Sequence, residues 1–137
     1  MRKLFIDTNI IIDLLGDRRP HSKFAASIFN KAELGEIKLY VSSLSFATTH
    51  YILKKNIGDK KLRTVLYTLL DYLNIIPIDS HILKRGLKSS YKDFEDGLQI
   101  IAASSVNEID AIITRNIKDF KESEIPAYPP DAILDKL

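Results

Sequence analysis

The sequence predicts an α/β fold, a three-layer α/β/α sandwich around a central parallel sheet of four to five strands. Four short and continuously apolar runs lie at residues 3–6, 38–41, 75–78 and 111–114. Such runs are typical of parallel strands that are covered on both faces, whereas a strand with one exposed face alternates apolar and polar residues. Segments with helical periodicity separate the runs, which predicts crossover connections onto a parallel sheet.

The remaining elements follow from local patterns. A fifth strand is expected at residues 127–128, and the prolines on either side confine it to a sheet edge. Helices are predicted over 21–34, 45–55, 59–73 and 93–107. The segment 59–73 is the most clearly amphipathic, and Asp59 is placed to cap its N-terminus. Its leucine-rich face could serve either the core or a homodimer contact.

Composition bounds the class of protein. With 137 residues, 45% hydrophobic and 28% charged, the chain suits one domain, residues 1–137, with its own core. The absence of cysteine excludes a disulfide scaffold, a zinc ribbon and a thiol nucleophile. No apolar run approaches the roughly 20 residues of a membrane helix, and the first residues do not resemble a signal peptide. We therefore expect a cytoplasmic protein with no membrane partner.

The net charge is close to neutral. Twenty Lys and Arg against 18 Asp and Glu give +2, so composition alone does not indicate nucleic-acid binding. The distribution of these charges decides the question. If several acids share one cleft, the rest of the surface should be distinctly basic.

Polar residues follow the predicted strands where ligands of open α/β sheets bind. Asp7, Thr8 and Asn9 come directly after the first strand, and Thr114 to Asn116 follow the fourth. Any one of the first three could simply cap the next helix, but three in a row favour a site. Asp13, further along, is expected to be an exposed helix acid.

Three carboxylates stand together in Asp93-Phe94-Glu95-Asp96. Asp93 as an N-cap and Asp96 near the third helical position would account for two of them. Carboxylates that repel one another near a further acid are also a common way to hold a hard divalent cation. Taken with Asp7, this cluster becomes a candidate metal site. Asn116 and Asp119 could extend it, or could be a cap and a solvent-facing acid.

Three segments together resemble the signature blocks of the PIN domain family. They are residues 5–13 (FIDTNIIID), 93–103 (DFEDGLQIIAA) and 112–120 (IITRNIKDF). The resemblance covers essentially the whole chain, in the order and spacing of the family. It implies a central parallel sheet and a metal-dependent ribonuclease, found mainly as VapC-like toxins that an antitoxin neutralises.

The resemblance also assigns roles to individual residues. Asp7 matches the first acid of the family, a direct metal ligand, and Asp96 matches the third, with Asp93 as an accessory acid. Asp96 is followed by Gly97, where the family usually has alanine. The catalytic set it implies is Asp7, Asp93, Asp96, Asn116 and Asp119, with metal ligands Asp7 and Asp96 and supporting polar residues Thr8, Asn9 and Thr114.

Two positions depart from the set of acids that the family pattern contains. Full members carry a glutamate in the helix after the second strand, where this chain has Thr48 or Thr49. Asn116 is neutral where many members have their fourth acid. His50 is close by, but a partly buried polar role is the preferred interpretation, since imidazole is a poor ligand for magnesium. The site therefore carries fewer charges than usual, which makes weak activity a real alternative.

The expected reaction is hydrolysis of an RNA phosphodiester with Mg²⁺ or Mn²⁺ bound between Asp7 and Asp96. Expected partners are the RNA substrate, an antitoxin protein and a second copy of the chain. A competing hypothesis keeps the fold but makes the protein an inactive RNA- or partner-binding module. A phosphotransfer enzyme of the haloacid-dehalogenase kind ranks lower, because that family needs an aspartate where this chain has Asn9.

Overall fold

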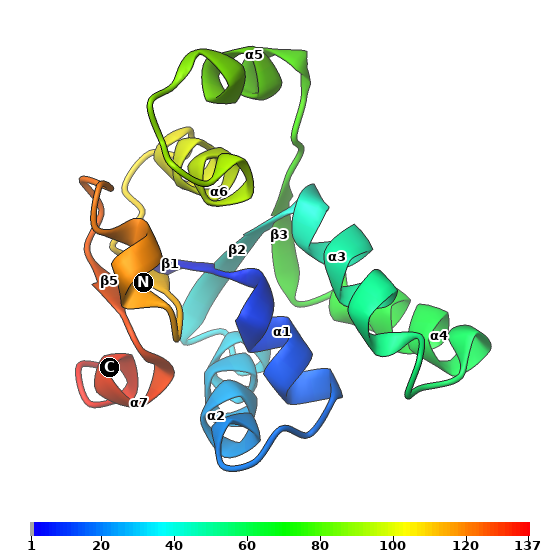
Figure 1. Cartoon of the computed structure of the whole chain (residues 1–137). Helices are drawn as coiled ribbons and strands as arrows, with labels where there is room; N and C mark the ends of the chain where they lie inside the picture. The colour runs from blue at the N-terminus through cyan, green and yellow to red at the C-terminus, as the bar shows by residue number, and fades with distance from the viewer. Residues whose placement is uncertain (1) are drawn as a thin grey trace.

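A five-stranded sheet, parallel throughout, forms the centre of the computed structural model, which describes residues 2–137 (Figure 1). The strand order is β3-β2-β1-β4-β5. The strands are β1 (Arg2–Ile6), β2 (Ile37–Ser42), β3 (Leu73–Ile76), β4 (Ala111–Ile113) and β5 (Ala127–Tyr128). The predicted parallel sheet is confirmed, and the fifth strand lies at an edge as its flanking prolines require.

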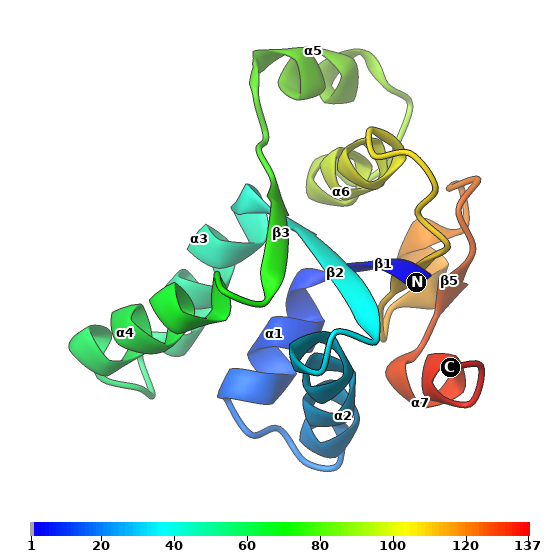
Figure 2. The same ribbon diagram turned by 180° about the vertical axis from the view of Figure 1, so that it is seen from behind.

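Helices cover both faces of the sheet. They are α1 (Thr8–Leu15), α2 (His21–Glu33), α3 (Ser43–Leu53), α4 (Asp59–Leu69), α5 (Ser80–Lys88), α6 (Phe94–Ser104), the 3₁₀ helix η1 (Ile117–Phe120) and α7 (Pro130–Leu134). Both ribbon views place α5 and α6 on one side and α1 to α4 on the other (Figure 2). The three-layer prediction is therefore confirmed.

Two hydrophobic clusters lie on opposite faces of the sheet. Leu4 and Ile6 of β1 join the cluster under α1, α2, α3, α4 and α7. Phe5, between them, joins the cluster under α5, α6 and η1. Because successive strand residues point to opposite faces, burial on both faces requires an unbroken apolar run. This geometry explains why the strands could be predicted from the sequence.

Two helices are shorter than their patterns predict, and one of them, expected over 93–107, spans Phe94–Ser104. The amphipathic segment 59–73 forms a helix only to Leu69, and Leu73 begins β3. The strand accordingly spans 73–76 and not 75–78, in register with β2 from Leu39 opposite Leu73. Leu73 fits the helical spacing by coincidence, and pairing with β2 overrides it. Pro77, which has no N–H to donate, follows the end of the strand.

The start of α4 also differs from expectation. Gly58 occupies the N-cap position, so Asp59 lies in the first turn and does not cap the helix. Its carboxylate instead contacts His50 Nε2 of α3 at 2.6 Å and Arg63 Nε at 2.7 Å. The hydrogen bond from His50 is the main reason why the pKa of Asp59 is lowered. His50 is partly buried, as predicted, and links two helices.

The leucine-rich face of α4 belongs to the core. Leu62, Leu66 and Leu69 are buried in the cluster beneath α1 to α4. Leu70 of the same segment is 42% exposed, so the apolar positions of this helix do not all serve the core. Within residues 2–137, no helix has the length and apolar content that a bilayer crossing requires.

Candidate active site

Asp7 stands where β1 ends and α1 begins. Its backbone N–H donates to the carbonyl of Ile113 at 2.9 Å, which ties it to the end of β4. The carboxylate accepts from the Thr8 N–H at 2.8 Å, the Thr114 hydroxyl at 2.8 Å and the Asn9 amide at 3.2 Å. Asp7 does cap α1, but two side chains from outside the cap also converge on it. The predicted companions Thr8, Asn9 and Thr114 are all in contact with it.

Burial shapes the chemistry of this carboxyl. Asp7 is only 8% exposed, and burial raises its pKa, while the hydrogen bonds from Thr114 and Thr8 oppose the rise. Repulsion from Asp119 adds to the increase. A nearby cation would stabilise the ionised form of an acid that is buried and repelled in this way.

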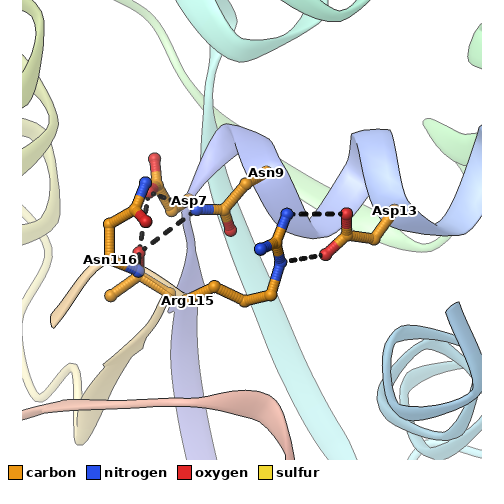
Figure 3. A network of polar contacts seen from close by, with 6 residues as sticks. Asp7, Asn9, Asp13, Arg115 and Asn116 are labelled. Carbon is orange, nitrogen blue, oxygen red and sulfur yellow. Dashed lines mark hydrogen bonds and ion pairs between the residues drawn. The ribbon is translucent and has the colours of Figure 1, made fainter. Parts of the chain in front are cut away.

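The turn after β4 completes this part of the site (Figure 3). The Thr114 hydroxyl accepts from the Asn116 N–H at 3.0 Å while it donates to Asp7. Asn116 lies at the N-cap position of η1, but its side chain makes no capping hydrogen bond. Asn9 Oδ1 is buried without a partner. The side-chain oxygens of Asn9 and Asn116, both near Asp7, therefore accept no hydrogen bond from the described residues.

The second cluster of acids lies at the start of α6. Asp93 caps this helix by accepting from the Asp96 N–H at 2.9 Å, as one interpretation of the sequence expected. Asp96 nevertheless has its pKa raised to about 7. Desolvation is the largest cause, followed by repulsion from Asp93, Asp119, Asp7 and Glu95. Capping explains Asp93 but not this accumulation of charge around Asp96.

Three of these acids line one cleft. Asp93, Asp96 and Asp119 share a cavity of about 250 Å³ between the start of α6 and η1. Asp7 does not line it, and Asn116 lines a neighbouring depression together with Asp119. The structure thus brings the predicted acids within electrostatic reach of one another, although they line separate hollows.

The donor chemistry of this cluster fits a hard divalent cation. Carboxylate and amide oxygens are the ligands that Mg²⁺ takes, and a bound cation would relieve the repulsion between Asp96 and the four acids around it. Asp7 Oδ1 accepts one hydrogen bond and so keeps a lone pair for a ligand. In the part of the chain that the structure describes, no three Asp, Glu or His side chains converge on one point that an ion could occupy. Binding would therefore draw the side chains together.

A neutral network occupies the region beside the missing glutamate. Thr49 is fully buried with an unpartnered hydroxyl. Ser45 of the same helix contacts the Thr8 hydroxyl at 2.7 Å, and Gln99 of α6 donates to both, at 3.2 Å to Thr8 and 3.0 Å to Ser45. Ser45 and Gln99 are not among the site residues that the sequence predicts. The signal for Gln99 was a polar residue three positions after Asp96 in an otherwise apolar helix.

Asp13 is not the exposed acid that the sequence suggested. It is 0% exposed and accepts two hydrogen bonds from Arg115, at 2.6 Å from Nε and 3.0 Å from Nη2 (Figure 3). Asp13 lies one turn after Asn9 on α1, on the side that meets the turn after β4. The pair fastens that turn, which carries Thr114 and Asn116, to the helix that Asp7 caps.

The chain is similar to known proteins both in sequence and in fold. The PIN domain family model matches residues 3–118. Ribonuclease VapC1 of Aquifex aeolicus is 28% identical over 139 residues, which cover 98% of this chain and 94% of that protein. A toxin-antitoxin complex from Klebsiella pneumoniae contains a chain 26% identical to this one, with a TM-score of 0.67 over 93% of this chain and 97% of the other.

Two further structures share the fold at lower identity. One is FitAB bound to an IR36 DNA fragment, 18% identical with a TM-score of 0.68 over 93% of this chain and 94% of the other. The second is VapBC2 from Rickettsia felis bound to a DNA fragment from its promoter, 18% identical with a TM-score of 0.66 over 93% and 98%. The family model covers most of the sequence and spans the strand ends that carry Asp7 and Thr114, so the chain belongs to the PIN domain family.

Proposed function

We propose that this chain is a metal-dependent endoribonuclease that hydrolyses RNA phosphodiester bonds and acts as the toxin of a toxin–antitoxin pair. Its similarity to a ribonuclease of the VapC type over nearly its full length supports the reaction. The toxin-antitoxin complex among its structural relatives supports the biological role. RNA, an antitoxin protein and a second copy of the chain are the partners that this role requires.

The observation that carries the proposal is the accumulation of acids around Asp96. The pKa of Asp96 is raised to about 7, first by desolvation and then by repulsion from four carboxylates that belong to three segments. A purely structural helix cap has no use for such repulsion, whereas a cation site requires it.

Asp7 and Asp96 are the residues that would hold the metal, with Asp93 and Asp119 beside them. A bound Mg²⁺ or Mn²⁺ supplies charge stabilisation at the attacked phosphate and lowers the pKa of a bound water. The protein fixes the first acid: Thr114 and Asn9 hold one carboxylate oxygen of Asp7, and the Thr8 N–H holds the other. Asp119, which is exposed and lines the same cleft as Asp96, would accept a proton from water or orient it.

A second candidate function has its own support. The position of the usual glutamate is threonine, and the adjoining network of Thr8, Ser45 and Gln99 is uncharged. With this arrangement the protein would bind RNA or a partner without cleaving either.

Cleavage of a single-stranded RNA by the purified protein with Mn²⁺ separates the two functions. We expect cleavage by the native chain and its loss in Asp7→Asn, which keeps the shape of the side chain but removes the charge. Asp71→Asn, at an exposed acid in the turn between α4 and β3, is the matched control and should cleave like the native chain. Cleavage that persists in Asp7→Asn would refute the proposed site, and a native chain that binds RNA without cutting it would favour the binding module.

A further inference from the structure

The acid cleft at the start of α6 also contains unpaired positive charge. Lys92, Lys118 and Lys121 line it together with four acids, which are Asp93, Asp96, Asp119 and Glu122. All three lysines are exposed, and none of them takes part in the ion pairs within 4.0 Å found among residues 2–137. The lysines therefore share a cavity with carboxylates but do not neutralise them. Both sets of charges stay available for ligands of opposite sign.

An aromatic ring completes the wall of this cleft. Tyr91 lines it and packs on the first turn of α6 at Gly97. A Cβ at position 97 would lie 2.9 Å from Cδ2 of the ring and 3.0 Å from Tyr91 Cβ. Even alanine would displace the tyrosine, so the glycine, where the PIN resemblance leads one to expect alanine, lets the ring sit against the helix.

We propose that Lys92, Lys118 and Lys121, together with the ring of Tyr91, seat a single-stranded RNA over the acid cleft. The lysines would contact phosphates on either side of the bond to be cleaved, and an unpaired base would stack on the tyrosine. The inference rests on the proposed function, because it assigns the way in which that same site holds its substrate.

The physical need for such a rim follows from the acids. Asp96 and the four carboxylates near it repel a polyanion, and the protein has a net charge of only +2. Cations at the edge of the cleft supply a local attraction that net charge does not. Lys92 precedes α6, whereas Lys118 and Lys121 lie in and just after η1, so phosphates could be held from two segments.

The aromatic ring favours single strands over duplexes. Bases in a duplex are stacked on one another and do not offer a free face, whereas single-stranded RNA can place a base on an aromatic side chain. Lysine contacts alone would serve a duplex equally well, so Tyr91 carries this part of the inference.

Binding is tested separately from cleavage. The full chain, in EDTA to prevent hydrolysis, is titrated into a fluorescein-labelled single-stranded RNA of mixed sequence, and anisotropy gives Kd between about 50 and 200 mM salt. The test variant replaces Lys92, Lys118 and Lys121 with alanine. The matched control replaces Lys55, Lys60 and Lys61, which are exposed near α4 and lie outside the cleft.

Each lost phosphate contact lowers the slope of log K against log salt by about 0.7 for a single strand. The cleft variant should therefore lose about 2 from the slope and roughly 100-fold in affinity at 0.1 M salt, while the control keeps the native slope. Tyr91→Ala should weaken binding of the single strand about 5- to 150-fold and leave binding of a blunt RNA duplex unchanged, and Tyr91→Phe should bind like the native chain.

Equal losses in the cleft and control variants, or no loss in either, would overturn the lysine contacts. Equal losses for duplex and single strand in Tyr91→Ala would overturn the stacking contact. These outcomes are distinct from failure of the proposed function. Rim-dependent binding without cleavage in Mn²⁺ would refute the nuclease and leave this inference standing, whereas cleavage that ignores the rim would do the reverse.

Discussion

Metal affinity should depend on pH through Asp96. The carboxyl must be ionised to bind a cation, and its pKa in the metal-free protein is raised to about 7 by desolvation and by four neighbouring acids. From this value about a tenth of Asp96 is ionised at pH 6 and about nine-tenths at pH 8. The apparent affinity for Mn²⁺ should therefore rise about tenfold over this range. The raised pKa of Asp7 acts in the same direction.

Calorimetric titration of Mn²⁺ at several pH values measures this profile. Asp96→Asn is the direct comparison, because it removes the titrating group and should flatten the part of the profile centred near pH 7 while it weakens binding. An affinity in the native chain that is independent of pH above about 5, as an ordinary surface aspartate would give, refutes the reasoning.

The stability of the metal-free protein gives an independent check on the same carboxyl. Because the folded pKa of Asp96 is higher than the ordinary value of 3.8, the folded state binds more protons than the unfolded state between these pH values. Stability should then fall as pH rises from about 4 to 7, by this group's contribution. In EDTA, Asp96→Asn should have a higher Tm than the native chain at pH 8 and a similar Tm at pH 4. A lower Tm at pH 8 would contradict the repulsion.

Three further predictions concern the surroundings of the site. Arg115→Met leaves the buried Asp13 carboxylate without its partner and should lower the free energy of unfolding by about 3–5 kcal/mol in urea, whereas the double change Asp13→Leu with Arg115→Met should recover much of it. Thr114→Val removes the hydroxyl that holds Asp7 and should reduce Mn²⁺ affinity or RNA cleavage about 10- to 100-fold with little change in Tm; an unchanged activity would show that Asp7 needs no such support. Gly97→Ala should destabilise the chain by about 1–2 kcal/mol, although alanine has the better helix propensity. The reason is that the new Cβ would meet the Cβ of Tyr91, which rotation of the Tyr91 ring cannot move away. A stabilised variant would contradict that contact.

The sheet was predictable because strands that are buried on both faces appear in the sequence as short, unbroken apolar runs. An unbroken run such as Leu4-Phe5-Ile6 has to alternate between two cores, and both are filled. The boundary between α4 and β3 was not predictable, because Leu73 satisfies the helical period and the strand equally well. Only its pairing opposite Leu39 decides, and that contact is distant in sequence.

The site was predictable in part for a similar reason. Strand ends place Asp7 and Thr114 together by topology, so their positions could be inferred from the order of elements. The partner of Asp13 could not, because the periodicity of α1 does not reveal that a turn more than 100 residues later supplies an arginine. Gln99 and Ser45 escaped notice since single polar residues in apolar helices carry no indication of what they meet.

The near-neutral net charge acquires a meaning once the acids are located. Five of the 18 acidic residues repel one another around Asp96, which leaves 13 acids elsewhere against the 20 Lys and Arg of the whole chain, three of which line the same cleft. The +2 balance is therefore a sum of an excess of acids around Asp96 and an excess of basic residues over the remainder. A cleft that concentrates carboxylates for a cation needs basic residues outside it to approach a polyanion, and the lysines at its rim stand at the boundary between the two. The proposed nuclease would need a separation of this kind, and not a uniform positive surface, to bind both a metal and RNA.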